Sequence, residues 1–311
     1  MGTRTALFSR NQPGGVFSIQ DLQAHPGDIW FVDSGCTTGS DAAGYGKNPD
    51  KPFATLDYAI GNCTASNGDV IYLMPGHAES LTTATSLTMD VAGVKVIGLG
   101  WGSTRPTFTI TTATTATWNV TAADCWIENV LIVGNFLNIA AAMTVAAGGD
   151  GLTLKNIETR DTSVILGALI QISIATTVTD VTIDGYKHIG VAGGLTAAAT
   201  NVILGAGTAD RLRLTNCEFH AHTSAAVVDF SADACAHVFV EGIRLLNTET
   251  SAGLGIAFHN SSTGFVDDVV TINLKNTVKG VTGTGLSIGP RVNYSNAVNA
   301  YAGLFSYTID S

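Results

Sequence analysis

Hydrophobic and polar residues alternate in short segments that recur at nearly constant spacing along the middle of the chain. Each segment is an apolar strand that turns at Asn, Gly or Asp and continues as a second strand. Within one of them, Leu212 and Leu214 alternate with polar neighbours, so the period is two and each strand buries one face. The segments are residues 126–132, 152–158, 181–186, 212–219, 238–245 and 265–270. The pattern predicts stacked β-strands.

The turning residue of each segment, its pivot, gives the length of the repeat. Successive pivots are 27, 29, 31, 26 and 26 residues apart when they are placed at Asn129, Asn156, Gly185, Asn216, Gly242 and Asp268. This period is typical of a solenoid with one coil per repeat, and three short strands fill each coil. An earlier pivot, Gly98, lies 31 residues before Asn129. Asn, Gly and Asp tolerate the positive φ of a tight corner, and stacking is expected to place the Asn129 and Asn156 amides in a short ladder.

The segment before these coils has a different pattern. Residues 29–32 and 68–76 supply two apolar strands, whereas residues 48–60 carry apolar side chains at helical spacing. Pro52 suits a first helical turn, and Gly61 can end the helix. We therefore expect a short helix that covers the open end of the solenoid, because an uncovered coil exposes its apolar interior.

Three entry segments also resemble a known superfamily. The run 47–60, followed by 68–76 and 94–98, is similar to the entry of right-handed parallel β-helices of the pectin-lyase-like type. The resemblance covers about residues 28–276. It implies an all-β, right-handed parallel β-helix solenoid with an N-terminal capping helix. It implies little about activity, because this fold hosts lyases, hydrolases, adhesins and viral structural proteins alike.

The two ends of the chain lack the repeat. Residues 1–27 are expected to form an N-terminal arm, residues 28–276 the parallel β-helix with its cap at about 48–61, and residues 277–311 a C-terminal cap or subunit-contact tail. The large apolar residues of the tail would be costly to leave in water, so they must cover the last coil or meet a neighbour. They are Tyr294, Tyr301, Leu304, Phe305 and Tyr307.

Composition narrows the range of partners. With 311 residues, 45% of them hydrophobic and 13% charged, the chain can bury a large core in about ten coils. The formal net charge of −10 argues against a nucleic-acid partner. Without a transmembrane-length apolar run or a signal-peptide pattern, we expect a soluble chain with no membrane partner. Weakly charged faces of Thr, Ala and Ser favour packing between subunits of a homotrimer, with flat unpartnered solenoid faces as the alternative.

Cysteines give no sign of a metal or cofactor. There are five, an odd number without a CxxC pair, which indicates neither a zinc site nor a complete disulfide framework. Cys125 and Cys217 lie inside predicted strands and are expected in the core. Cys36 and Cys63 are the one pair to test for a disulfide. No cofactor is expected.

Carboxylates are the first candidates for catalysis. Polysaccharide-cleaving β-helices place two or three carboxylates on neighbouring coils, or combine a calcium-binding acidic cluster with an Arg or Lys base. The one adjacent pair here is Asp267 and Asp268. One of the two must point inward or occupy the pivot, so a structural turn is favoured and the pair is a weak catalytic candidate. No other residue is assigned to catalysis.

Acidic residues also stand beside the pivots, where stacking would align some of them as a stripe on neighbouring coils. Such a stripe would bind calcium or present acid groups to a glycan. Cations on the same stretches favour cross-coil salt bridges instead. The acidic residues are Glu128, Glu158, Asp184, Glu218, Glu241 and Asp267, and the cations are Lys155, Lys187, Arg213 and Arg244.

Histidines and tryptophans offer two further candidate sites. His220 and His222 share one side of a predicted strand, as a two-histidine metal site requires, and His237 or Asp229 would supply a third ligand. Polar surface histidines are the favoured alternative, so these are weak metal candidates. Trp101 lies on a Gly-rich loop where it would form a platform for a sugar ring, although packing within the cap is the more ordinary explanation for it and for Trp30, Trp118 and Trp126.

A capped β-helix with sparse charge and no recognised catalytic motif favours a non-enzymatic structural protein of a bacteriophage particle. The entry segment and arm also resemble β-helix proteins encoded among phage structural genes. The protein would decorate or cement the capsid at the virion surface as a trimer, in contact with the major capsid protein or another virion protein. The alternative is a glycan depolymerase, acting as a polysaccharide lyase or glycoside hydrolase, or a carbohydrate-binding tail or adhesin protein that contacts a host surface glycan.

Overall fold

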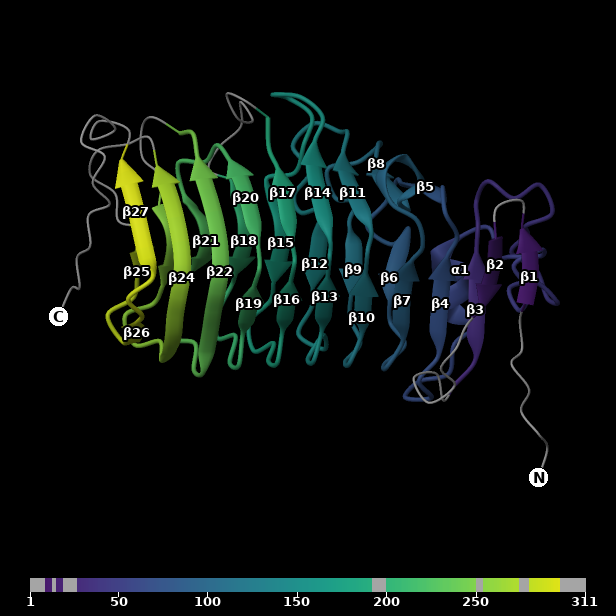
Figure 1. Cartoon of the computed structure of the whole chain (residues 1–311), viewed down its shortest axis with the longest axis horizontal. Coiled ribbons are helices and arrows are strands. Elements are labelled where there is room, and N and C mark those ends of the chain that lie inside the picture. The colour runs from purple at the N-terminus through teal and green to yellow at the C-terminus, as the bar shows by residue number, and fades with distance from the viewer. Residues whose placement is uncertain are drawn as a thin grey trace.

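Strands of successive coils stack side by side along one axis in this computed structural model, a parallel β-solenoid of about seven turns (Figure 1). The structure describes residues 9–12, 15–18, 27–191, 200–249, 254–273 and 280–296. The expectation of a β-solenoid is confirmed, but that of about ten coils is too high. Ile29 pairs directly with Val70, so the 40 residues between them form one wide excursion, which adds no second or third strand to the stack.

A complete coil supplies two strands, or one long strand, to a 17-stranded sheet and one strand to an 8-stranded sheet. The first strands are β3 (Ile29–Val32), β4 (Val70–Leu73), β7 (Lys95–Gly98), β10 (Trp126–Glu128), β13 (Thr153–Lys155), β16 (Thr182–Asp184), β19 (Arg213–Thr215) and β26 (Leu286–Ile288). The second strands are β5 (Ala78–Leu81), β8 (Thr107–Ile110), β11 (Leu131–Gly134), β14 (Glu158–Asp161), β17 (Lys187–Ile189), β20 (Glu218–Ala221) and β27 (Val292–Asn296). Two long strands run through the pivot and serve as both, namely β22 (Val238–Asn247) and β24 (Gly264–Asn273).

The third strands form the 8-stranded sheet. They are β6 (Leu87–Met89), β9 (Trp118–Val120), β12 (Met143–Val145), β15 (Ile170–Ile174), β18 (Asn201–Gly205), β21 (Ala226–Phe230), β23 (Leu254–Phe258) and β25 (Val281–Thr282). An antiparallel hairpin, β1 (Ser9–Gln12) and β2 (Gly15–Ser18), precedes the solenoid.

The interior is a continuous apolar stack. Ile127, Leu154 and Ile183 occupy the same register in successive coils and are fully buried. Elsewhere Phe108 and Trp118 pack with their ring centroids 4.7 Å apart. Each coil thus removes the apolar face of its neighbour from water, and this burial drives the stacking. Cys125 and Cys217 are buried in the core as predicted.

The predicted helix is present but shorter than expected. It is α1 (Leu56–Gly61), whose Leu56, Ala59 and Ile60 are buried, and it lies at the N-terminal end of the solenoid (Figure 1). The expectation that Pro52 opens it is wrong, because Phe53 is still engaged in a bridge with Val32. A role of α1 as the cap remains an expectation. Over the described ranges, no helix has the length and apolarity needed to span a membrane.

The pivots are built by the backbone. Asn129, Asn156, Gly185, Asn216, Gly242 and Asp268 have φ between 47° and 72°, the left-handed region. Gly98 holds the same register but has no positive φ, because the chain continues there into a loop. In place of the expected ladder of side-chain amides, the pivots are joined to the next coil by backbone hydrogen bonds. The N–H groups of Asn129 and Asn156 donate to the next coil, at Lys155 O and Asp184 O, while the Asn129 amide donates back to Gly98 O and Gly100 O.

Replacing Asn156 by Val is expected to lower the free energy of unfolding by about 1–3 kcal/mol, because a β-branched residue is strained at a φ of 51°. Asn156→Gly is the matched control, since Gly adopts this φ without strain. Urea unfolding of the three proteins measures the difference. Equal midpoints for the Val and Gly variants would contradict a backbone role for the pivot.

Candidate functional site

The outward side chains of the first strands form a row along the solenoid axis. Strand register aligns Glu128, Lys155, Asp184, Thr215, Glu241 and Asp267. Four of the six acidic residues beside the pivots therefore stack on one face, interrupted by Lys155 and Thr215. Glu158 and Glu218 lie on second strands instead, where Glu158 meets Arg105 and Glu218 meets Lys187.

A polar hollow of about 280 Å³ opens on this face, and we call it the outer groove. Its lining comes from β16, β19, β22 and the pivot after β19, namely Thr182, Asp184, Arg213, Thr215, Asn216 and Glu241. Asp184 Oδ1 accepts hydrogen bonds of 2.8 Å from Thr215 Oγ1 and from Asn216 Nδ2. These two donors fix the carboxylate at the groove wall.

Asp184 and Glu241 lie at the same register two coils apart, with Thr215 between them. Two strand spacings of about 4.8 Å put their backbones about 10 Å apart. Inverting glycosidases hold their two carboxyl groups about 6.5–9.5 Å apart, which leaves room for a water molecule. Glu241 Oε1 also lies 3.2 Å from Arg291 Nη2. The groove thus carries two carboxylate residues whose backbones are about 10 Å apart.

Arg213 adds a cation to the same groove. Its guanidinium lies over the ring of Phe239, 4.6 Å from the centroid, on the outward face of the neighbouring strand. The ring holds the cation at the groove edge through a cation–π contact. Arg213 is thus held at the wall of the groove that Asp184 and Glu241 also line.

The two predicted catalytic candidates, Asp267 and Asp268, pair with different arginines. Asp267 continues the outward row, and its Oδ2 accepts a hydrogen bond of 2.9 Å from Arg291 Nε. Burial opposes ionisation of Asp267, but hydrogen bonds from the Asp268 backbone and from Arg291 outweigh it and lower its pKa. Asp268 is a pivot, and its Oδ1 lies 3.0 Å from Arg244 Nη2. Both carboxylates are engaged in cross-coil ion pairs.

A second polar hollow, the corner pocket, lies where second strands lead into third strands. Asp161, Gln171, His188 and His222 contribute to its wall. Asp161 Oδ1 accepts hydrogen bonds of 3.1 Å from Gln171 Nε2 and from the Ala168 N–H. Burial raises the pKa of Asp161 to about 6, and burial lowers the pKa of His188 to about 3. Both side chains are therefore uncharged near pH 5.

His188 belongs to a buried hydrogen-bond chain behind this pocket. Its Nδ1 lies 2.9 Å from Thr159 Oγ1, which lies 2.7 Å from the Tyr186 hydroxyl. Burial raises the pKa of Tyr186. A fully satisfied polar chain of this kind fixes the packing of neighbouring coils, so we assign it a structural role.

The predicted metal ligands are not brought together. His220 Nε2 lies 2.8 Å from Glu218 Oε1, whereas His222 Nε2 lies 3.2 Å from Glu249 Oε2. The backbone N–H of His237 donates to Thr263 Oγ1 at a turn. In the part of the chain that the structure describes, no three His, Cys, Asp or Glu side chains form a group that could hold a metal ion.

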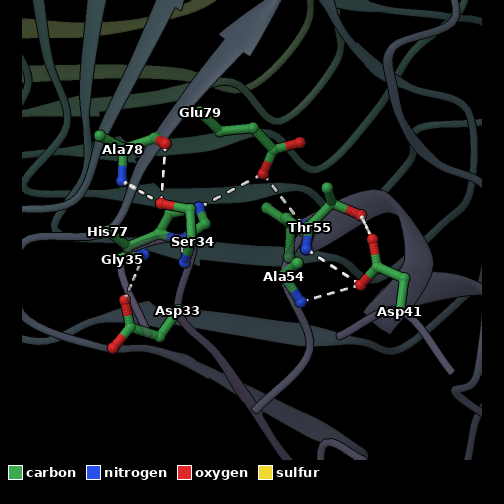
Figure 2. Close-up of polar contacts among 10 residues, drawn as sticks. Asp33, Ser34, Gly35, Asp41, Ala54, Thr55, His77, Ala78 and Glu79 are labelled. Carbon is green, nitrogen blue, oxygen red and sulfur yellow. Dashed lines mark hydrogen bonds and ion pairs between the residues drawn. The ribbon is translucent and has the colours of Figure 1, made fainter. Parts of the chain in front are cut away.

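Ser34, His77 and Glu79 lie together beside α1, a combination of residue types found in hydrolase triads (Figure 2). Their hydrogen bonds exclude that role. His77 Nδ1 accepts from the Ser34 backbone N–H at 3.1 Å, and the Ser34 hydroxyl is bonded to the backbone of Ala78. Glu79 Oε2 lies 3.3 Å from His77 Nε2 and accepts from the Leu56 N–H, so this cluster holds the start of α1.

Asp41 anchors the other side of the same turn. Its carboxylate accepts hydrogen bonds from the N–H groups of Ala54 and Thr55 and from the Thr55 hydroxyl (Figure 2).

Cys36 and Cys63, the pair considered for a disulfide, are free thiols. Burial raises the pKa of the Cys63 thiol to about 12, which makes it unreactive at neutral pH.

Trp101 is exposed, so the expectation that it packs within the cap is wrong. Its side chain is 85% accessible, whereas Trp30 and Trp118 are buried. Trp126 stands on the outward face near the ammonium groups of Lys95 and Lys155, at 4.3 and 5.9 Å from its ring centroid.

No family model and no curated protein matches the chain. Among solved structures, a rhamnogalacturonan lyase is similar over 79% of this chain and 69% of its own, with 15% identity and a TM-score of 0.53. A GH136 lacto-N-biosidase from Eubacterium ramulus is similar over 87% of this chain and 57% of its own, with 12% identity and a TM-score of 0.41. The first likeness concerns the fold alone, a parallel β-solenoid, and the second is too distant to carry an argument. The phage part of the sequence-based expectation finds no support in either.

Sequence reasoning missed the groove as a unit and missed Asp161 and His188. A signal for the groove was present, since the residue before each pivot gives the outward row directly. No comparable signal existed for the corner pocket, because Asp161, Gln171 and His188 come from strands of two different sheets, and the segments that join those strands have unequal lengths.

Proposed function

We propose that this protein is a glycan-cleaving β-solenoid that hydrolyses a neutral polysaccharide in the outer groove. One of Asp184 and Glu241 donates a proton to the leaving oxygen, and the other activates a water molecule on the opposite face of the sugar. The stereochemical outcome is inversion. In this proposal the solenoid is right-handed, and α1 closes its N-terminal end.

The observation that carries this proposal is the register of the two carboxylates. They project from one face at the same position of coils two apart, and both line an open polar hollow. An open hollow on a long, flat sheet face accepts an extended polymer, whereas the corner pocket is enclosed by buried side chains. The likeness in fold to a lyase agrees with a carbohydrate substrate but does not select one.

Charge favours a neutral glycan over a polyanionic one. The chain has a formal net charge of −10, and the groove combines two carboxylates with the single guanidinium of Arg213. A polyuronate would be repelled by such a surface. Hydrolysis by two carboxyl groups also needs no uronate in the substrate, whereas lyase chemistry depends on one.

A panel of neutral and acidic polysaccharides, assayed for new reducing ends, tests the proposal. We expect products from a neutral polymer and none with the unsaturated ends that a lyase leaves. Unsaturated products would instead establish a lyase. Binding without cleavage would make the protein a carbohydrate-binding adhesin.

Three further proposals are separate from the groove. The protein forms a trimer, it contacts the capsid or another virion protein, and it lies on the virion surface. An apolar corner, with Leu137 48% and Ile165 50% exposed, favours contact with another protein subunit. Light scattering should give the mass of a trimer for the native chain and a lower mass for Ile165→Asp. A monomeric native chain would remove the support for assembly and leave the groove proposal intact.

A further inference from the structure

Trp101 is the most exposed of the large hydrophobic side chains in the described ranges. A tryptophan buries more apolar area than most side chains when it finds a partner, so leaving 85% of it in water is unfavourable for the isolated chain. The ring of Trp101 is therefore available for contact with a ligand.

The loop that carries Trp101 is held in one conformation. Thr104 Oγ1 bonds to both the carbonyl and the N–H of Trp101, and Thr104 O accepts from the Gly76 N–H. The Asn129 amide holds the carbonyls of Gly98 and Gly100. Trp101 is thus presented on a rigid base, which lowers the entropy cost of binding.

The loop stands on the edge of the solenoid that also borders the outer groove. It leaves the sheet at Gly98, the position in register with the pivot Asn129. Asn216, a pivot of the same row, lines the groove. Asp184 precedes the pivot Gly185, which lies three coils beyond Gly98. At about 4.8 Å a coil, the Trp101 loop and Asp184 are therefore about 14 Å apart along the axis. A linear ligand along this edge meets both.

The surroundings of Trp101 suit a sugar better than a protein. Its neighbours Gly102, Ser103 and Thr104 are exposed and carry no large apolar group. Charged side chains lie behind the loop, where Arg105 Nη1 bonds to Glu158 Oε2 at 2.8 Å and Arg160 Nε bonds to Glu158 Oε1. A lone aromatic ring among polar groups matches a sugar, which offers an apolar C–H face with hydroxyl groups around it.

We propose that Trp101 is a remote sugar-binding subsite, and that the protein selects neutral glycans long enough to reach from the outer groove to this ring. The inference rests on the proposed glycan-cleaving function and adds its substrate class: long chains, held at two points on one edge. A short oligosaccharide fills the groove alone and binds more weakly.

The test compares long and short fragments of the neutral polysaccharide that the native protein cleaves. Trp101→Ala should weaken the affinity for long fragments about tenfold and leave that for short fragments unchanged, with Trp101→Phe in between. Leu137→Ala, which removes an exposed apolar side chain at another corner, is the matched control. Trp30 and Trp118 are buried, so iodide quenching of tryptophan fluorescence reports on Trp101 and on the outward Trp126. A long fragment should reduce the part of the quenching that Trp101→Ala removes.

The outcomes separate this inference from the function on which it rests. Cleavage by the native protein with unchanged long-fragment affinity in Trp101→Ala overturns the subsite alone. A native protein that neither binds nor cleaves any glycan overturns both. A lower particle mass of Trp101→Ala in light scattering, with glycan binding intact, would assign the ring to subunit contact and also overturn the subsite.

Discussion

Replacing Asp184 by Asn is expected to lower the rate of glycan cleavage about 100- to 10,000-fold, the usual contribution of a positioned acid or base. Asn keeps the shape of the side chain, and its carbonyl can still accept the hydrogen bonds from Thr215 and Asn216. Folding should therefore be retained. Glu241→Gln should give a loss of similar size, because the two carboxyl groups act in one step.

Asp180→Asn is the matched control for this loss. Asp180 lies four residues before Asp184 in the same coil, and its Oδ2 accepts a hydrogen bond of 2.6 Å from Arg211 outside the groove. Its replacement removes one carboxylate of the same kind and should leave the rate within about twofold of the native value, as exposed ion pairs contribute little. Equal losses in Asp180→Asn and Asp184→Asn would locate the effect in general charge or stability instead of catalysis.

Asp161→Asn is expected to change how stability depends on pH. The pKa of Asp161 rises from 3.8 to about 6 on folding, chiefly through burial. A carboxyl group whose pKa is raised on folding stabilises the folded state fully below pH 3.8. This stability is lost as the pH rises through 6. The shift corresponds to about 3 kcal/mol. The variant has no such loss, so its free energy of unfolding relative to the native protein should rise by about 2.5 kcal/mol from pH 4 to pH 7.5.

His188, which contacts Asp161, has the opposite dependence. Its pKa falls from 6.5 to about 3 on folding, so the stability that it contributes is lost as the pH drops from 6.5 towards 3. His188 Nε2 lies 3.7 Å from Asp161 Oδ2, so the comparison is made above pH 4, where the histidine is neutral in the folded state of both proteins. Asp233→Asn, which removes an exposed carboxylate, is the control. Urea unfolding at several pH values measures the effect, and a difference that stays constant with pH would show that Asp161 is not shifted by burial.

The coils were predictable because their signals are local. An alternating strand and a residue that tolerates positive φ lie within eight positions of each other, so Asn156 and Asn216 could be placed on corners from sequence alone. The helix was placed too early, because the propensity of Pro52 for a first turn was overridden by the bridge between Val32 and Phe53.

The groove was harder to predict because Asp184 and Glu241 are 57 residues apart. They line one groove only because two coils of different length return to the same strand register. Thr215 occupies the position between them. Trp101 was misplaced for a related reason. At Gly98 the chain leaves the corner as a loop instead of continuing into the second strand. The glycines around Trp101 signalled this loop, but no neighbouring residue signalled that the indole stays in water.

The anomeric configuration of the first product of cleavage tests the central claim most directly. Proton NMR of a neutral polysaccharide, followed from the moment the native protein is added, reports this configuration before it equilibrates. The spacing of Asp184 and Glu241 predicts a product of inverted configuration. A product that retains the configuration of the substrate, or no product from any neutral polysaccharide, would contradict the assignment of these two carboxylates.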